Sequence, residues 1–272
     1  MTYEELYDEW INQPYEDSCT EKFEIRDGVA IIPEGTTKIG NRAFEDCSSL
    51  ESVTIPESVT EIGYGAFDGC TSLESITLPD SVTIIDWRAF EGCTSLKNVT
   101  LPDSVTFLGE NAFSCCTSLE SITISKSVTE IGHYAFDGCS SLKSIIIPES
   151  VRKMGIGTFR WCTLLESIAI PELVTTIECN AFMGCTSLKN ITIPKSVTKI
   201  EQNAFKGCTS LESIAIPESV MEIDETAFDD CTALTAIYVP PMKTNYYKER
   251  LCEELHDKIV ELEPEKRTKV RK

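Results

Sequence analysis

The cysteines are the residues of this chain whose chemistry must be assigned first. The sequence of 272 residues holds 13 of them, and nine recur at a spacing of 23, from Cys47 to Cys231. Each has a phenylalanine three residues before it and a leucine three residues after it. Stacked repeats would place these sulfur atoms in a row, whereas a disulfide needs crossing Cβ vectors and tetrahedral zinc needs four converging ligands. We therefore expect a reduced, buried cysteine ladder, with disulfides or a metal site as the alternatives.

Other catalytic chemistry has little support in the sequence. The two histidines, His133 and His256, are far apart in the array, and the acidic residues are scattered. No glycine-rich phosphate loop follows a strand, no His-Glu-x-x-His motif occurs, and no serine lies in a nucleophile elbow. We expect no enzymatic activity, no cofactor and no metal, and the one alternative is an enzyme site in a cleft between a cap and the array.

A 23-residue period organises the chain from about residue 24 to residue 240. A fixed period of roughly 20 to 50 residues is typical of solenoids, propellers and repeat arrays. In the unit that starts at Cys70, the alternation over residues 76–78 predicts a short strand, which Pro79 ends. Ala89, Phe90 and Cys93 predict one helical turn facing inward. Stacked units of this kind predict an α/β repeat solenoid with one long parallel sheet, strands about 4.8 Å apart, and short helical turns opposite.

The two ends of the chain differ from the repeat. Residues 2–12 predict an amphipathic helix with Tyr3, Leu6, Tyr7 and Trp10 on one face, so residues 1–22 form an N-terminal capping segment. The array spans residues 23–240, with a degenerate first coil. Residues 241–263 are expected to form a C-terminal cap, with a helix over residues 244–256 and a short strand at residues 259–260. Residues 264–272 are basic and are expected to be a disordered tail.

Net charge limits the possible partners. The chain has 24 basic and 44 acidic residues, a formal charge of −20, so nucleic acid and anionic membrane surfaces are poor partners. No apolar stretch reaches the roughly 18 residues of a membrane span. The N-terminus does not have the pattern of a secretory signal. We expect no membrane insertion, a monomer with capped ends, and a cytoplasmic location if the chain is complete.

The repeat resembles the leucine-rich repeats of the BspA-like proteins. The matching positions in one unit are Cys47 to Leu50, Val53, Ile55-Pro56, Ser58-Val59, Ile62-Gly63 and Ala66-Phe67. This resemblance implies a right-handed arc with helical caps at both ends. It also implies a secreted or cell-surface protein that binds a protein ligand or mediates adhesion, with no catalytic motif. The alternative is a structural or self-associating repeat protein without a single defined site.

Differences between the repeats are the only lead to a binding site. One repeat position varies freely, and aromatic or apolar departures from the unit cluster between residues 64 and 161. Exposed aromatic side chains on one side of a molecule are typical of a binding surface. The alternative is sequence drift at unconstrained positions. The candidate partner-binding residues are Tyr64, Ile84, Trp87, Phe107, His133, Tyr134, Ile156 and Trp161.

Overall fold

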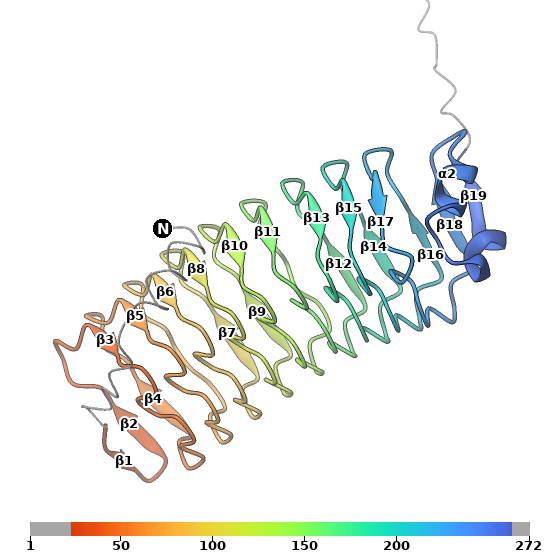
Figure 1. Cartoon of the computed structure of the whole chain (residues 1–272). Helices are drawn as coiled ribbons and strands as arrows, with labels where there is room; N and C mark the ends of the chain where they lie inside the picture. The colour runs from red at the N-terminus through yellow and green to blue at the C-terminus, as the bar shows by residue number, and fades with distance from the viewer. Residues whose placement is uncertain (1–22, 263–272) are drawn as a thin grey trace, which may run out of the picture.

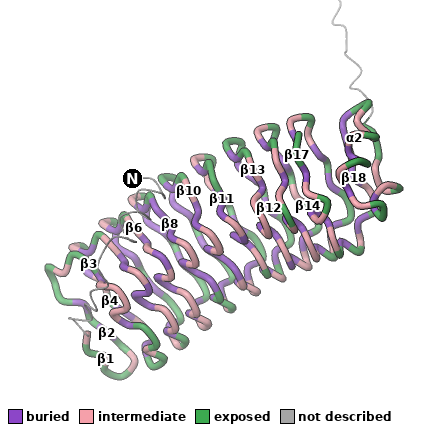
Figure 2. Tube along the Cα trace, in the orientation of Figure 1, coloured by how far each residue is buried: buried purple, intermediate pink, exposed green. Residues whose placement is uncertain are grey.

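A computed structural model describes residues 23–262, and Figure 1 shows them as a row of stacked coils. Parallel pairing with a register of 23 residues makes this a parallel β-solenoid of about 10 turns. Figure 2 shows the buried residues along the inner surface of the coils and the exposed residues on the outer rims. The predicted N-terminal capping helix (residues 1–22) and the basic tail (residues 264–272) lie outside the described residues.

Each coil contributes to two parallel β-ladders. The first ladder contains β2 (Val29–Ile31), β4 (Ser52–Thr54), β7 (Asn98–Thr100), β9 (Ser121–Thr123), β12 (Ser167–Ala169), β14 (Asn190–Thr192), β16 (Ser213–Ala215) and β18 (Ala236–Val239), and isolated bridges continue it through Ser75, Ser144 and Ile146. The second ladder contains β3 (Lys38–Ile39), β5 (Glu61–Ile62), β6 (Ile84–Ile85), β8 (Phe107–Leu108), β10 (Glu130–Ile131), β11 (Lys153–Met154), β13 (Thr176–Ile177), β15 (Lys199–Ile200) and β17 (Glu222–Ile223). At the N-terminal end, β1 (Ile25–Arg26) pairs antiparallel with β2.

The prediction of one long parallel sheet is therefore wrong. The described strands form six separate sheets along the two ladders. The two ladders are separate because a proline ends the pairing after each first-ladder strand except β9, where Ser125 replaces it. After the next turn, the chain extends again for two residues and pairs a second time, as at Glu61↔Ile84 and Ile62↔Ile85. The second residue of each such strand, for example Ile62 or Ile85, points into the core, which is why this repeat position is apolar in the sequence.

The predicted helical turn around the Ala-Phe dipeptide is also wrong, because the described repeats form turns there. Alternate N–H groups donate to the next coil: Arg42 N to the Tyr64 carbonyl at 2.8 Å and Phe44 N to the Ala66 carbonyl at 2.8 Å. Arg42 itself has a φ of 57°, in the left-handed region. A helix would use these N–H groups within one coil, whereas the turn uses them to join neighbouring coils.

Two side-chain ladders fill the core. Phenylalanine rings from Phe23 to Phe228 stack at centroid distances between 5.1 and 5.9 Å. The buried cysteine ladder is confirmed from Cys70 to Cys231, whereas Cys47 in the first coil is half-buried. Each thiol from Cys70 to Cys231 also donates to a phenylalanine carbonyl 26 residues earlier in the chain, as Cys139 Sγ does to Phe113 at 3.1 Å. Burial raises the pKa of the Cys70 thiol to about 12, so this ladder stays protonated and unreactive.

The C-terminal end carries a short α-helix, α2 (Thr244–Lys248), a 3-10 helix, η1 (Glu253–Lys258), and β19 (Ile259–Glu261), which pairs parallel with β18. The expected continuous helix over residues 244–256 is interrupted at Cys252, whose backbone is extended (φ −59°, ψ 152°). Tyr247, Leu251 and Leu255 of this segment are nevertheless buried, and the Tyr247 hydroxyl donates to the Val220 carbonyl at 3.2 Å. None of the described helices is long and apolar enough to cross a membrane.

Candidate binding surface

Two of the predicted site residues, Ile84 and Phe107, form a pair across the second ladder. They lie directly opposite each other in adjacent strands. Elsewhere the same positions hold opposite charges: Lys38 and Glu61 pair at 2.5 Å, and Lys199 pairs with Glu222 at 3.1 Å. The apolar pair therefore replaces a cross-strand ion pair, and Phe107 keeps only 8% of its surface exposed. We interpret both residues as part of the ladder.

The repeat position that varies freely comes two residues after each second-ladder strand, as at Asn41, Tyr64 and His133. There a side chain of one coil accepts the N–H of the next: Asn41 Oδ1 accepts Tyr64 N at 3.2 Å, and His133 Nδ1 accepts Ile156 N at 2.7 Å. Burial lowers the pKa of His133, which favours the neutral ring that this acceptor role requires. Four of the candidate residues lie along this row, and each is partly or largely buried: Tyr64, Trp87, His133 and Ile156.

The expectation that Trp87 and Phe107 are exposed is wrong. Trp87 is only 7% exposed, and its backbone N–H donates to Asp86 Oδ1 at 2.7 Å. Burial raises the pKa of that Asp86 carboxyl, while the hydrogen bond from Trp87 opposes the rise. Aromatic residues placed this deeply belong to the core of the coil and cannot form the centre of a contact surface.

Tyr134 lies on the following turn, in contact with a charged pair. The Arg160 guanidinium donates to both carboxylate oxygens of Asp137, at 3.0 and 2.8 Å, and lies 5.1 Å from the centroid of the Tyr134 ring. Bidentate pairing and cation–π stacking hold all three side chains in one arrangement. Tyr134 is therefore an ordered, half-buried part of the surface.

Trp161 is the predicted residue with the clearest surface position. Its side chain is 47% exposed, although its backbone φ of 58° is rare for a bulky residue. The ring lies over Gly184 of the next coil, with Cζ3 and Cδ2 only 2.7 and 2.8 Å from the place that a Cβ atom would take. One face of the indole thus packs on the glycine, and the other side of the ring is left to solvent.

Three further exposed apolar residues lie on the coil of Trp161 (residues 139–161) and on the next coil (residues 162–184), and the sequence analysis missed them. Ile146, Leu164 and Leu173 are 84%, 44% and 41% exposed. In the other regular coils before the last one, which begins at Cys231, these positions hold threonine or alanine, serine, and serine, respectively. Comparison of the residues within each repeat position could have found them. We call Ile146, Trp161, Leu164 and Leu173 the middle-coil surface.

Catalytic and metal-binding arrangements are not found within residues 23–262. No group of three or more histidine, cysteine or acidic residues in this range could hold a metal ion. A hollow at the N-terminal end of the same range is lined by residues such as Phe23, Val29 and Ile31. Its lining offers apolar side chains and a few exposed charges, with no nucleophile beside a general base.

Comparisons with known proteins give the same picture of the chain. The family model for the BspA type leucine-rich repeat region matches six copies, over residues 28–83, 63–177 and 153–265. A leucine-rich cell surface protein from Faecalibacterium prausnitzii is 29% identical, with 86% of this chain and 84% of that chain covered and a TM-score of 0.49. The pneumococcal vaccine antigen PcpA is 22% identical over 83% of this chain and 65% of its own, with a TM-score of 0.53.

The T. pallidum leucine-rich repeat protein is 31% identical, with 67% of this chain and 77% of that chain covered and a TM-score of 0.48. A search of curated proteins gives no significant match. The family model covers most of the chain, including the region built from the 23-residue coils. The chain belongs to the BspA-type leucine-rich repeat family.

Proposed function

We propose that this chain is a non-catalytic protein-binding module that contacts its partner through the middle-coil surface. The observation that carries the proposal is the clustering of four exposed apolar side chains on the adjacent coils of residues 139–184. Large apolar side chains grouped on a soluble surface are typical of protein-interaction sites, and tryptophan is enriched among residues that dominate binding energy.

Stability of the solenoid gives no reason for these four residues. Trp161 occupies a left-handed backbone position, which costs a residue with a Cβ atom about 1–2 kcal/mol relative to glycine. At the same place in the next two coils, Gly184 and Gly207 stack closely, so glycine fits the fold without change. A partner that covers the indole and its apolar neighbours supplies a reason for retaining them.

The test restores the consensus residue at each of the four positions. The quadruple variant Ile146→Thr, Trp161→Gly, Leu164→Ser and Leu173→Ser should fold with a Tm close to that of the wild type. Its capture of partners from the natural environment, measured by quantitative mass spectrometry, should fall at least about 30-fold, equivalent to a loss of about 2 kcal/mol.

Met221→Thr is the matched control, because Met221 is also an exposed apolar residue (58%) at a position where most coils have threonine. This control should capture partners as the wild type does. A folded quadruple variant with unchanged capture contradicts the proposal. Concentration-dependent oligomers in light scattering, lost in the quadruple variant, would instead favour a self-associating repeat protein.

A further inference from the structure

Charge is distributed unevenly along the array, and this suggests the chemistry of the partner. Residues 47–138 hold 13 acidic and 3 basic residues, and residues 208–230 hold 7 acidic and no basic ones. Residues 139–207 between them hold 5 acidic and 8 basic residues, a net charge of +3. The middle-coil surface lies inside this segment. Arg160, Lys199 and Lys206 pair with carboxylates outside it, so the cations left for a partner are those without such a pair.

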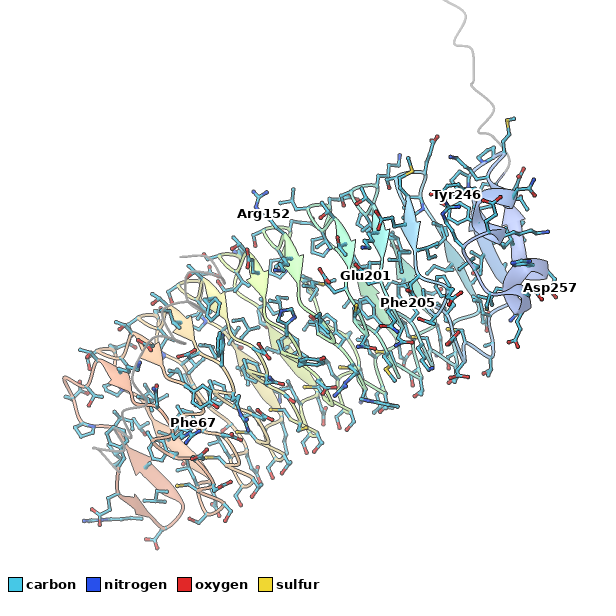
Figure 3. All side chains as sticks on the ribbon, in the orientation of Figure 1. Phe67, Arg152, Glu201, Phe205, Tyr246 and Asp257 are labelled. Carbon is cyan, nitrogen blue, oxygen red and sulfur yellow. The ribbon has the colours of Figure 1, made fainter. Side chains whose placement is uncertain are left out.

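Several of these positive charges have no internal partner. Along the first ladder, Lys97 pairs with Glu74 at 3.0 Å and Lys189 with Glu166 at 3.5 Å. By contrast, the exposed side chains of Lys143 and Arg152 form no ion pair with any residue of the described range 23–262. Figure 3 shows Arg152 projecting outward from the rim of the array.

Both unpaired cations are close to the apolar residues in the register of the coils. Lys143 precedes the exposed Ile146 by three residues in the same coil. Arg152 follows the rim turn of that coil, and Leu173 lies on the corresponding turn of the next coil. Adjacent strands of a parallel sheet are only about 4.8 Å apart, so one extended segment can reach both kinds of side chain.

We propose that the partner presents a short acidic protein segment with apolar side chains, whose carboxylates pair with Lys143 and Arg152. This inference rests on the proposed function and specifies its partner. Guanidinium–carboxylate pairs are strong and directional, while the apolar side chains cover Ile146, Leu164 and Leu173. The acidic ends of the array do not prevent such contact, because charges more than about 8 Å away are largely screened at physiological ionic strength.

Other charged partners fit this surface less well. A basic segment would be drawn to residues 208–230, where seven carboxylates have no basic residue among them in the sequence, and would leave the apolar side chains uncovered. Nucleic acid offers phosphates but no apolar side chains to cover Ile146, Leu164 and Leu173. The acidic, apolar segment is the class that matches both properties.

The test uses three fluorescent synthetic peptides of equal length with identical spacing of leucine and phenylalanine, in which the polar positions are all glutamate, all glutamine or all lysine. We expect the full chain to bind the glutamate peptide at least ten-fold more tightly than the glutamine peptide in fluorescence anisotropy at 150 mM salt. The variant Lys143→Glu/Arg152→Glu should remove this preference. The control Lys126→Glu/Lys248→Glu, which lies outside residues 139–207 and changes net charge equally, should keep it.

Failure of this inference is distinguishable from failure of the proposed function. Equal binding of the glutamate and glutamine peptides, or tighter binding of the lysine peptide, overturns the acidic partner. The acidic partner is also overturned if an oligothymidylate probe binds more tightly than the glutamate peptide and this binding is lost in Lys143→Glu/Arg152→Glu. If this variant still captures the natural partners that the quadruple apolar variant loses, the binding surface stands and only its charge preference is rejected.

Discussion

The phenylalanine ladder predicts that the same truncation costs more in the middle of the array than at its C-terminal end. Phe113 is fully buried and stacks on two rings, Phe90 at 5.1 Å and Phe136 at 5.9 Å. Phe228 is equally buried but, among the described rings, stacks only on Phe205, at 5.4 Å. Truncation of either to alanine costs about 3–5 kcal/mol, and each aromatic stack adds about 0.5–1.5 kcal/mol. Phe113→Ala should therefore cost about 0.5–1.5 kcal/mol more than Phe228→Ala.

Urea unfolding measures this difference. Tryptophan fluorescence and far-UV circular dichroism must give coincident transitions, because long repeat arrays can unfold in parts. The pair Phe113→Leu and Phe228→Leu is the control, since leucine keeps most of the apolar volume and removes only the ring stacking. Equal losses for the two alanine variants, or a larger loss for Phe228→Ala, would refute the argument that each ring is held by both neighbours.

Three further outcomes are expected. His133→Asn should keep a hydrogen-bond acceptor for Ile156 N but remove the titrating imidazole. Burial lowers the pKa of His133, so the stability that its neutral ring contributes is complete above about pH 6.5 and is lost as pH falls. The Tm of the wild type should therefore drop relative to that of the variant between pH 7.5 and 5.5. Trp87→Ala and Phe107→Ala should each lower the Tm by several degrees, and an unchanged Tm for either would contradict their burial. Removal of residues 1–22 should lower the Tm and raise the binding of an apolar dye, because we expect residues 2–12 to cover the hollow lined by Phe23 and Ile31.

Periodicity is what allowed the core to be predicted from the sequence. Phe44, Cys47 and Leu50 each recur every 23 residues along the chain. Such short units can bury so many apolar residues only by stacking on one another. The backbone between the columns was harder to predict. Strands of two residues, such as β5, are too short to show an alternating pattern.

The helical turn was mispredicted for a related reason. Ala, Phe and Cys at spacings of one and three residues face inward both in a helical turn and in the observed turn, so the side-chain pattern is the same for both. The difference lies in backbone hydrogen bonds, such as Phe44 N to the carbonyl of Ala66 in the next coil at 2.8 Å. A sequence read one coil at a time does not contain that information.

The candidate site shows which departures from a repeat indicate function. Ile84 departs from the charged pattern, but its register neighbour Phe107 departs with it, and the pair packs across the ladder. Arg160 departs together with Tyr134, with which it forms a ring contact, and it forms a bidentate pair with Asp137, which keeps an acidic residue common at its position. Such paired departures exchange one internal interaction for another, so they need no external partner.

Unpaired departures are different in kind. Ile146 is 84% exposed, and the corresponding residues of the adjacent coils are Thr123 and Ala169, which cannot cover it. Arg152 stands where most coils have threonine, and it likewise finds no ion pair within residues 23–262. When the adjacent coils do not compensate an unusual residue, the fold gives no reason to retain that residue, because the consensus residue would serve the fold as well. In a solenoid, where each coil contacts only its two neighbours, compensation can be checked completely from the register. The coils in which it fails are therefore where the partner is expected.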